Sequence, residues 1–208
     1  MASKPTPFYL LMGSLSHLVL RGGFRLKTSG NENLPKEGGF VLASNHLSNL
    51  DPWPLALAVW PRVVRFMAKA EAIDSPLLGP FISAQGAFPV RRGERDSGAL
   101  EMAVRILRNG DPLVMFPEGT RRKPGRPIKH HTGAVRVAME AGVPLIPAGL
   151  AGTDRLSRFA AQTVRYGPPV PLDDLVGLPP REAAQEGTER LMKAIHGLEA
   201  ELAAGLGR

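Results

Sequence analysis

His46 and Asp51 have the residue types and the spacing of a general base and the carboxylate that orients it. They lie in the stretch from Phe40 to Pro52, which begins as a short apolar run typical of a buried strand and becomes polar at Asn45. Asp51 followed by Pro52 indicates a helix start. Across the intervening loop, the Asp51 carboxylate could accept the Nδ1 proton of His46 and leave Nε2 free to remove a proton from a substrate.

Taken alone, these two residues also allow a purely structural interpretation. Asp51 could be only a helix cap, and His46 could be a loop residue that is hydrogen-bonded to the backbone. A second stretch, Phe116-Pro117-Glu118-Gly119-Thr120-Arg121, favours the chemical interpretation, because it again places polar side chains directly after an apolar run.

The segment from 91 to 130 is strongly basic. It holds ten arginines and lysines against five acidic residues, an excess of five positive charges in a chain whose net charge is +7. Arg92 and Arg121 each follow an apolar strand, and a guanidinium group can bind phosphate through two hydrogen bonds. Gly119 permits close approach of the backbone, and Thr120 adds a hydroxyl donor. These residues predict a site for a phosphorylated ligand.

Two parts of this segment have more than one interpretation. Glu118 could orient a basic group, hydrogen-bond a substrate hydroxyl, or hold Arg121 in place. The basic run at 122–126 could belong to the ligand site or to a solvated face of the protein.

Composition limits the classes of function. The 208 residues, 43% of them hydrophobic, suit one globular domain. The chain has no cysteine, which excludes disulfides, zinc-thiolate sites and cysteine nucleophiles. Its positive charge favours anionic partners such as acidic lipid headgroups or phosphorylated substrates. Nucleic acid is not expected as a partner, because aromatic residues for base stacking make up only 6% of the chain. No stretch is apolar for long enough to cross a bilayer.

The elements that must position these residues alternate between strands and helices, which predicts a single α/β domain with a mixed central sheet flanked by helices. Helices are expected at 6–21, 52–60, 97–108, 133–141 and from 181 onward; strands are expected at 24–28, 40–44, 63–67, 86–92, 112–116, 143–150 and 164–166. Two prolines in 143–150 predict a short strand or an edge strand there. Three polar clusters follow predicted strands, at Asn45-His46, at Arg91-Arg92 and at 118–121. Because ligands bind beyond the carboxyl ends of strands in such sheets, we expect one shared site.

The polar stretches together resemble a known family. Asn45-His46-x-Ser48-x-x-Asp51 resembles the His-x4-Asp block of the glycerolipid acyltransferases, the family of bacterial 1-acyl-glycerol-3-phosphate acyltransferase. The stretch 116–121 matches the second signature of that family residue for residue. Residues 86–92 are similar to the block between them, which ends in a phosphate-contacting arginine, and 143–147 resemble the final apolar block. The four blocks occur in the order of the family.

The resemblance implies an enzyme that moves a fatty acyl group from acyl-CoA or acyl carrier protein to the free hydroxyl of 1-acyl-glycerol-3-phosphate. The product would be phosphatidic acid, in phospholipid synthesis, and neither a metal nor a cofactor would be needed. The implied roles are as follows: His46 is the general base, Asp51 orients it, Arg92, Glu118, Gly119, Thr120 and Arg121 hold the glycerol phosphate, and Asn45, Ser48 and Lys129 support the site.

One departure from the family pattern affects the choice of acceptor. The residue before Arg92 is often acidic in the family and is Arg91 here. Together with Arg122 it predicts a more basic acceptor pocket, so the acceptor could also be another anionic lysolipid or glycerol-3-phosphate. A non-catalytic protein that binds anionic lipid is the alternative from another class. A metal-dependent hydrolase using His46 and Asp51 is the last choice, because further ligands at metal spacing are missing.

The resemblance divides the chain into an apolar N-terminal helix, residues 1–22, and an acyltransferase domain, residues 23–208. The helix could lie in the headgroup region of a membrane, or it could pack on the body of the domain. The first interpretation predicts a peripheral or monotopic protein on the cytoplasmic face of the cell membrane. Its partners would be anionic lipids, the lysophospholipid acceptor and the thioester donor.

Overall fold

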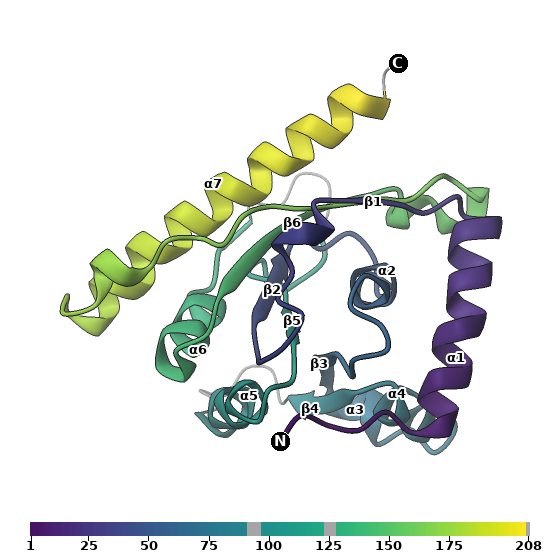
Figure 1. Cartoon of the computed structure of the whole chain (residues 1–208), viewed down its shortest axis with the longest axis horizontal. Helices are drawn as coiled ribbons and strands as arrows, with labels where there is room; N and C mark the ends of the chain where they lie inside the picture. The colour runs from purple at the N-terminus through teal and green to yellow at the C-terminus, as the bar shows by residue number, and fades with distance from the viewer. Residues whose placement is uncertain (91–96, 123–127, 207–208) are drawn as a thin grey trace.

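The computed structural model describes residues 1–90, 97–122 and 128–206, and its centre is a seven-stranded mixed sheet (Figure 1). Its strands are β1 (Lys27–Ser29), β2 (Val41–Ser44), β3 (Arg65–Lys69), β4 (Ala87–Val90), β5 (Leu113–Met115), β6 (Leu145–Ala151) and β7 (Thr163–Tyr166). They lie in the order β1-β7-β6-β2-β5-β3-β4. Every neighbouring pair is parallel except β6 and β7. The predicted single α/β domain with a mixed sheet is confirmed.

Helices cover both faces of the sheet (Figure 1). Their bounds are α1 (Pro7–Leu18), α2 (Pro52–Leu57), α3 (Ala70–Ile73), α4 (Gly79–Ala84), α5 (Ser97–Arg108), α6 (Gly133–Ala141) and α7 (Pro180–Leu206). A π-helical turn extends α1 over Val19–Gly23, and short 3₁₀ turns lie at Asn31–Asn33, Thr153–Arg158 and Asp173–Leu175. The predicted helices at 97–108 and 133–141 coincide with α5 and α6, whereas the region 70–82 contains two short helices, α3 and α4.

The sheet has one hydrophobic core on each face, because successive side chains of its central strands point to opposite faces. Val41 and Ala43 of β2 pack with α5, α6 and α7, while Leu42 between them packs on the opposite face with residues of α2 and with Leu20. All three side chains are fully buried. A parallel strand that is covered on both faces has no solvent-exposed side, and its sequence is therefore an uninterrupted apolar run.

The prediction of a short or edge strand at 143–150 was wrong. β6 has seven residues and lies in the interior of the sheet, between β7 and β2. The carbonyl of Pro147 accepts a bond from Gly167, so the backbone of this residue faces the β7 side of β6 and not β2. The missing N–H therefore costs at most one bond to the segment after β7, just before the β6–β7 ladder begins at Ala148. The predicted edge strand near the N-terminus is present as β1, which pairs only with β7.

Candidate active site

The candidate site begins where β2 ends, and Asn45 fixes that end. Its Nδ2 donates to the carbonyl of Leu150 at 2.9 Å, and its Oδ1 accepts from the N–H of the same residue at 2.8 Å. The buried amide side chain thus continues the pairing of β2 with β6 by one residue beyond Ser44. Because Asn45 is held at two points, the next residue, His46, leaves the sheet in a defined direction.

His46 and Asp51 form the predicted pair. Nδ1 of His46 lies 2.8 Å from Oδ2 of Asp51, and the carboxylate is fully buried. The same oxygen accepts the N–H groups of Leu47 at 2.6 Å and of Ser48 at 2.8 Å. These donors stabilise a buried negative charge, and the carboxylate in turn holds Nδ1 as the protonated nitrogen.

Asp51 does not cap the helix that follows it. Its side chain makes no capping hydrogen bond to α2, and both of its backbone donors, Leu47 and Ser48, precede it in the loop. The interpretation of Asp51 as only a helix cap is therefore wrong. The hydroxyl of Ser48 accepts the N–H of Leu50 at 3.3 Å, so this side chain supports the loop itself.

The other oxygen of Asp51 is bound by a residue that the sequence did not indicate. Oγ1 of Thr153, just beyond the end of β6, donates to Oδ1 at 2.6 Å, and both groups are buried. The two residues are 102 positions apart. The strand order explains the contact, since β6 lies beside β2 and their carboxyl ends meet.

Phe116 supports the imidazole from one face. Its ring stacks on that of His46, with centroids 4.1 Å apart and planes at 16°. Nε2 of His46 forms no hydrogen bond with the described part of the chain, and the residue as a whole retains 8% exposure. One nitrogen is therefore fixed by Asp51, and the other is available to an incoming ligand.

The turn that follows Phe116 contains four of the predicted binding residues, Glu118, Gly119, Thr120 and Arg121. Gly119 has a φ of 64°, and a Cβ atom at this position would lie 2.8 Å from the ring of His131. The positive φ favours glycine, and a larger residue would also displace the exposed ring of His131. Thr120 and Arg121 are exposed, and so is Lys129.

Glu118 pairs with Arg122, not with Arg121. Its Oε1 accepts bonds from Nε and Nη2 of Arg122 at 2.9 and 2.6 Å, and the guanidinium also binds both carboxylate oxygens of Glu199 on α7 at 2.7 and 2.9 Å. The backbone N–H of Arg122 donates to the carbonyl of His46 at 3.0 Å. This network fixes the stretch 116–121 against both the loop that contains His46 and the C-terminal helix α7.

The network changes the predicted charge of the site. Burial alone would lower the pKa of Arg122, but the hydrogen bonds to Glu118 and Glu199 outweigh it and raise that pKa above its ordinary value. Two carboxylates thus more than balance the charge of the one guanidinium. The prediction that Arg122 makes the acceptor pocket more basic was wrong, and this side chain is not part of a solvated basic face. Arg91 and Arg92, the other cations of that prediction, lie outside the described residues.

Two contributors to the site were missed by sequence reasoning. Thr153 and Glu199 carry no local signal, because each acts on a residue far away in the chain. Within residues 1–90, 97–122 and 128–206, no group of three or more histidine and acidic side chains could hold a metal ion.

Comparison with known proteins gives a consistent result. The family model described as Acyltransferase matches residues 25–151. A Bacillus subtilis protein named 1-acyl-sn-glycerol-3-phosphate acyltransferase is 32% identical over 89% of this chain and 92% of its own length. A Borreliella burgdorferi protein of the same name is 26% identical over 71% of this chain and 59% of its own. The crystal structure of the 1-acyl-sn-glycerophosphate acyltransferase PlsC from Thermotoga maritima covers 93% of this chain and 88% of its own, with a TM-score of 0.64 and 25% identity.

Proposed function

Because this chain belongs to the acyltransferase family, we propose that it transfers a fatty acyl group from a thioester to the free hydroxyl of 1-acyl-glycerol-3-phosphate, giving phosphatidic acid. The observation that carries the proposal is the His46–Asp51 pair, in which Nδ1 is fixed at 2.8 Å and Nε2 is unbonded among the described residues. The names of the relatives in Bacillus and Borreliella support the choice of acceptor.

The reaction follows from this geometry. Nε2 of His46 removes the proton of the acceptor hydroxyl as its oxygen attacks the carbonyl carbon of the thioester. The resulting imidazolium is stabilised by the buried carboxylate of Asp51, as in other histidine–carboxylate pairs. Collapse of the tetrahedral oxyanion breaks the carbon–sulfur bond, and the leaving thiolate takes the proton from Nε2. No covalent acyl-enzyme, metal ion or cofactor is part of this scheme.

The acceptor would bind at the turn that contains Gly119, Thr120 and Arg121. Thr120 and Arg121 are exposed, and the neighbouring Glu118 is held in place by its ion pair with Arg122. Arg121 forms no ion pair with any described residue. An unpaired guanidinium and a free hydroxyl are suited to a phosphate monoester. We assign Arg92 to the same phosphate from the family pattern alone, and Lys129 and Ser48 to supporting positions.

The assay is formation of phosphatidic acid, detected by mass spectrometry, from lysophosphatidic acid and long-chain acyl-CoA or acyl carrier protein thioester. We expect wild type to form product and His46→Ala to lose activity by about 10²–10⁴-fold, the usual contribution of a general base. His196→Ala, an exposed histidine on α7, is the matched control and should keep wild-type activity.

The outcomes separate the alternatives. Product from another lysolipid or from glycerol-3-phosphate, with lysophosphatidic acid inactive, would overturn the acceptor assignment alone. Equal activity in His46→Ala and wild type would overturn the mechanism. If every acceptor is inactive with both donors while anionic vesicles are still bound, the chain is a non-catalytic lipid-binding protein.

We also propose that α1 docks the protein on the cytoplasmic face of the cell membrane as a peripheral or monotopic protein. The helix buries Tyr9, Gly13 and Ser16 against the domain and exposes its large apolar residues, with Leu11 at 66% and Leu18 at 71% exposure. The described residues contain no helix that is long and apolar enough to span a bilayer. An outward-facing apolar stripe of this kind suits a helix that lies in the interface.

A second element extends this surface. Phe8 of α1 packs edge-on against Phe81 of α4, with ring centroids 6.3 Å apart, and both rings are nearly half exposed. Leu77, which precedes α4, is 88% exposed. We define the α1–α4 apolar surface as Phe8, Leu11, Leu15, Leu18, Leu77, Leu78 and Phe81. Contiguous apolar side chains on a soluble domain mark an interaction surface.

Vesicle binding tests the docking proposal. Deleting α1 would damage the fold, because the hydroxyl of Tyr9 bonds the backbone at Arg62 and Val64, so exposed leucines are substituted instead. Leu11→Ser combined with Leu18→Ser should reduce sedimentation with vesicles containing phosphatidylglycerol by about tenfold or more, since burial of each leucine contributes roughly 1.5–3 kcal/mol. The control, Val176→Ser, removes an exposed apolar side chain that precedes α7 and does not belong to the α1–α4 apolar surface. Equal sedimentation of the double variant and wild type would overturn the proposal.

A further inference from the structure

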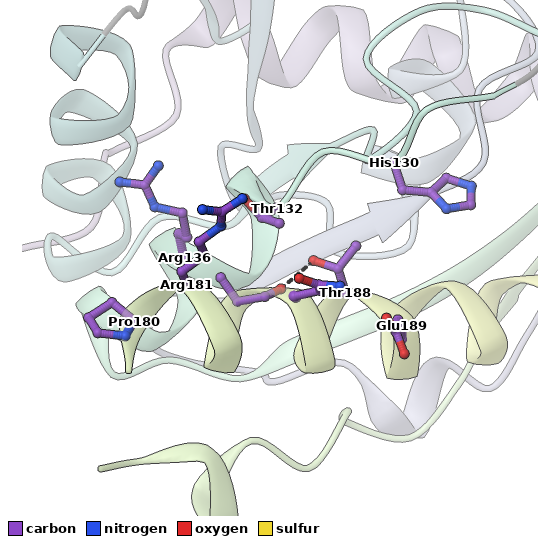
Figure 2. A pocket seen from close by; sticks show the side chains of 9 residues that line it. His130, Thr132, Arg136, Pro180, Arg181, Thr188 and Glu189 are labelled. Atoms are coloured by element: carbon purple, nitrogen blue, oxygen red, sulfur yellow. Dashed lines mark hydrogen bonds between the residues drawn. The ribbon is translucent and has the colours of Figure 1, made fainter. Parts of the chain in front are cut away.

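A hollow of about 660 Å³ lies between the start of α6 and the N-terminal part of α7, outside the site described above. Figure 2 shows Arg136 and Arg181 at one end of it, Thr132 beside them, and Glu189 at the other end. His130 and Thr188 also line it. Two cations and a histidine against one carboxylate give the hollow a positive character.

The two arginines have no partner of opposite charge. The guanidinium groups of Arg136 and Arg181 form no ion pair or hydrogen bond with a described residue, although they share one hollow. Arg190, on the same helix as Arg181, is paired with both Asp174 and Glu186. Both guanidinium groups are exposed to solvent, so they are free to bind an anion that enters the hollow, and guanidinium groups suit phosphate oxygens.

The start of α6 adds further donors. Thr132 precedes the first turn of α6 and makes no capping bond, and that turn contains no acidic residue. The N–H groups of a helix start favour a negative charge, so the helix contributes in the same sense as the arginines. The hydroxyl of Thr188, by contrast, is already bonded to the carbonyl of Ala184 and shapes the wall only.

The hollow adjoins the candidate active site through two neighbouring residues. His130 lines the hollow. The ring of His131 lies against Gly119, and the backbone N–H of His131 donates to the carbonyl of Pro117 in the same turn. His46 does not line the hollow. A ligand group bound here would therefore sit beside the site but away from the reacting atoms.

That position distinguishes the two phosphorylated substrates. In the acceptor, the phosphate is separated from the reacting hydroxyl by only the glycerol carbons, so it must bind close to His46. In a thioester donor, the phosphate lies at the far end of the pantetheine arm. Resting on the proposed function, we infer that the hollow formed by His130, Thr132, Arg136, Arg181 and Thr188 binds a phosphate of the acyl donor.

The test is steady-state kinetics of Arg136→Gln combined with Arg181→Gln. Both side chains are exposed, so the double variant should fold, which a thermal melt verifies. The KM for acyl-CoA should rise by about tenfold or more, as for loss of charge-assisted bonds. The KM for lysophosphatidic acid and the kcat at saturating donor should remain those of wild type. Lys193→Gln, an exposed cation of α7 outside the hollow, is the matched control.

Different donors identify the phosphate. An N-acetylcysteamine thioester carries no phosphate, so wild type and the double variant should use it at equal rates. A raised KM of the double variant for both acyl-CoA and acyl carrier protein thioester would place the phosphate of phosphopantetheine in the hollow. A raised KM for acyl-CoA alone would place the nucleotide phosphates there. An unchanged KM for both donors, or a raised KM for lysophosphatidic acid instead, would overturn the inference.

Failure of the proposed function remains distinguishable. If wild type has no acyl-transfer activity, calorimetric titration with CoA itself still tests the hollow. Weaker CoA binding by the double variant than by wild type and Lys193→Gln would uphold the site. Equal CoA affinity in all three proteins would overturn it.

Discussion

Thr153→Val tests the geometry of the site without changing a group that touches substrate. Oγ1 of Thr153 donates at 2.6 Å to Oδ1 of Asp51, and no other described residue binds that oxygen. Both side chains are buried. Valine keeps the shape of threonine and removes only the donor, so one oxygen of a buried carboxylate loses its partner.

The expected magnitude follows from these contacts. Loss of a hydrogen bond to a charged buried group lowers the free energy of unfolding by about 1.5–3 kcal/mol. For a chain of this size, Tm falls by roughly 2–4 °C for each kcal/mol. Oδ2 keeps its three donors, so Asp51 stays in place but with less restraint on its orientation. If the weaker restraint raises the free energy of the transition state by about 1.4 kcal/mol through His46, kcat falls about tenfold.

Urea denaturation and the kcat for acyl transfer measure the two effects. Thr153→Ser is the matched control, because it keeps the hydroxyl and loses one methyl group, and it should resemble wild type in kcat. Wild-type stability and kcat in Thr153→Val would refute the reasoning. A loss of kcat in Thr153→Ser as large as that in Thr153→Val would assign the effect to packing rather than to the hydrogen bond.

Four further substitutions probe the framework of the site. In urea denaturation, Arg122→Met should lower the free energy of unfolding by about 3–5 kcal/mol, because it leaves the buried charge of Glu118 without a partner. Glu199→Gln changes a partly exposed position and should lower it by less in the same experiment. Asn45→Leu should cost about 2–4 kcal/mol in urea denaturation, since a buried N–H and a buried carbonyl of β6 lose their partner. Gly119→Ala should raise the KM for lysophosphatidic acid, because it strains a φ of 64° and displaces the ring that packs there; an unchanged KM would contradict the role of the turn.

The local part of the site could be predicted from the sequence. The strand, loop and helix from Phe40 to Pro52 lie close together in the chain, and residue types alone indicate a pair between His46 and Asp51, which the structure contains at 2.8 Å. Two of the three predicted polar clusters, Asn45-His46 and 118–121, also meet at one edge of the sheet, because parallel strands bring their carboxyl ends together; the third, Arg91-Arg92, lies outside the described residues.

The remaining contacts could not be predicted, because they depend on which strands and helices become neighbours. Thr153 reaches Asp51 across 102 residues and Glu199 reaches Arg122 across 77. Nothing in the segment around either residue distinguishes it from an ordinary turn or helix surface. The interior position of β6 was missed for the same reason: the effect of Pro147 depends on where its partner strand β7 ends.

Asp51→Asn is the measurement that tests the central claim most directly. The substitution keeps the size of the side chain and removes the charge that holds Nδ1 of His46 and stabilises the imidazolium. The account predicts that kcat for phosphatidic acid formation falls by about 10²–10⁴-fold while the KM for lysophosphatidic acid is unchanged. A kcat equal to that of wild type in a folded Asp51→Asn protein would contradict the claim that this carboxylate makes His46 the base.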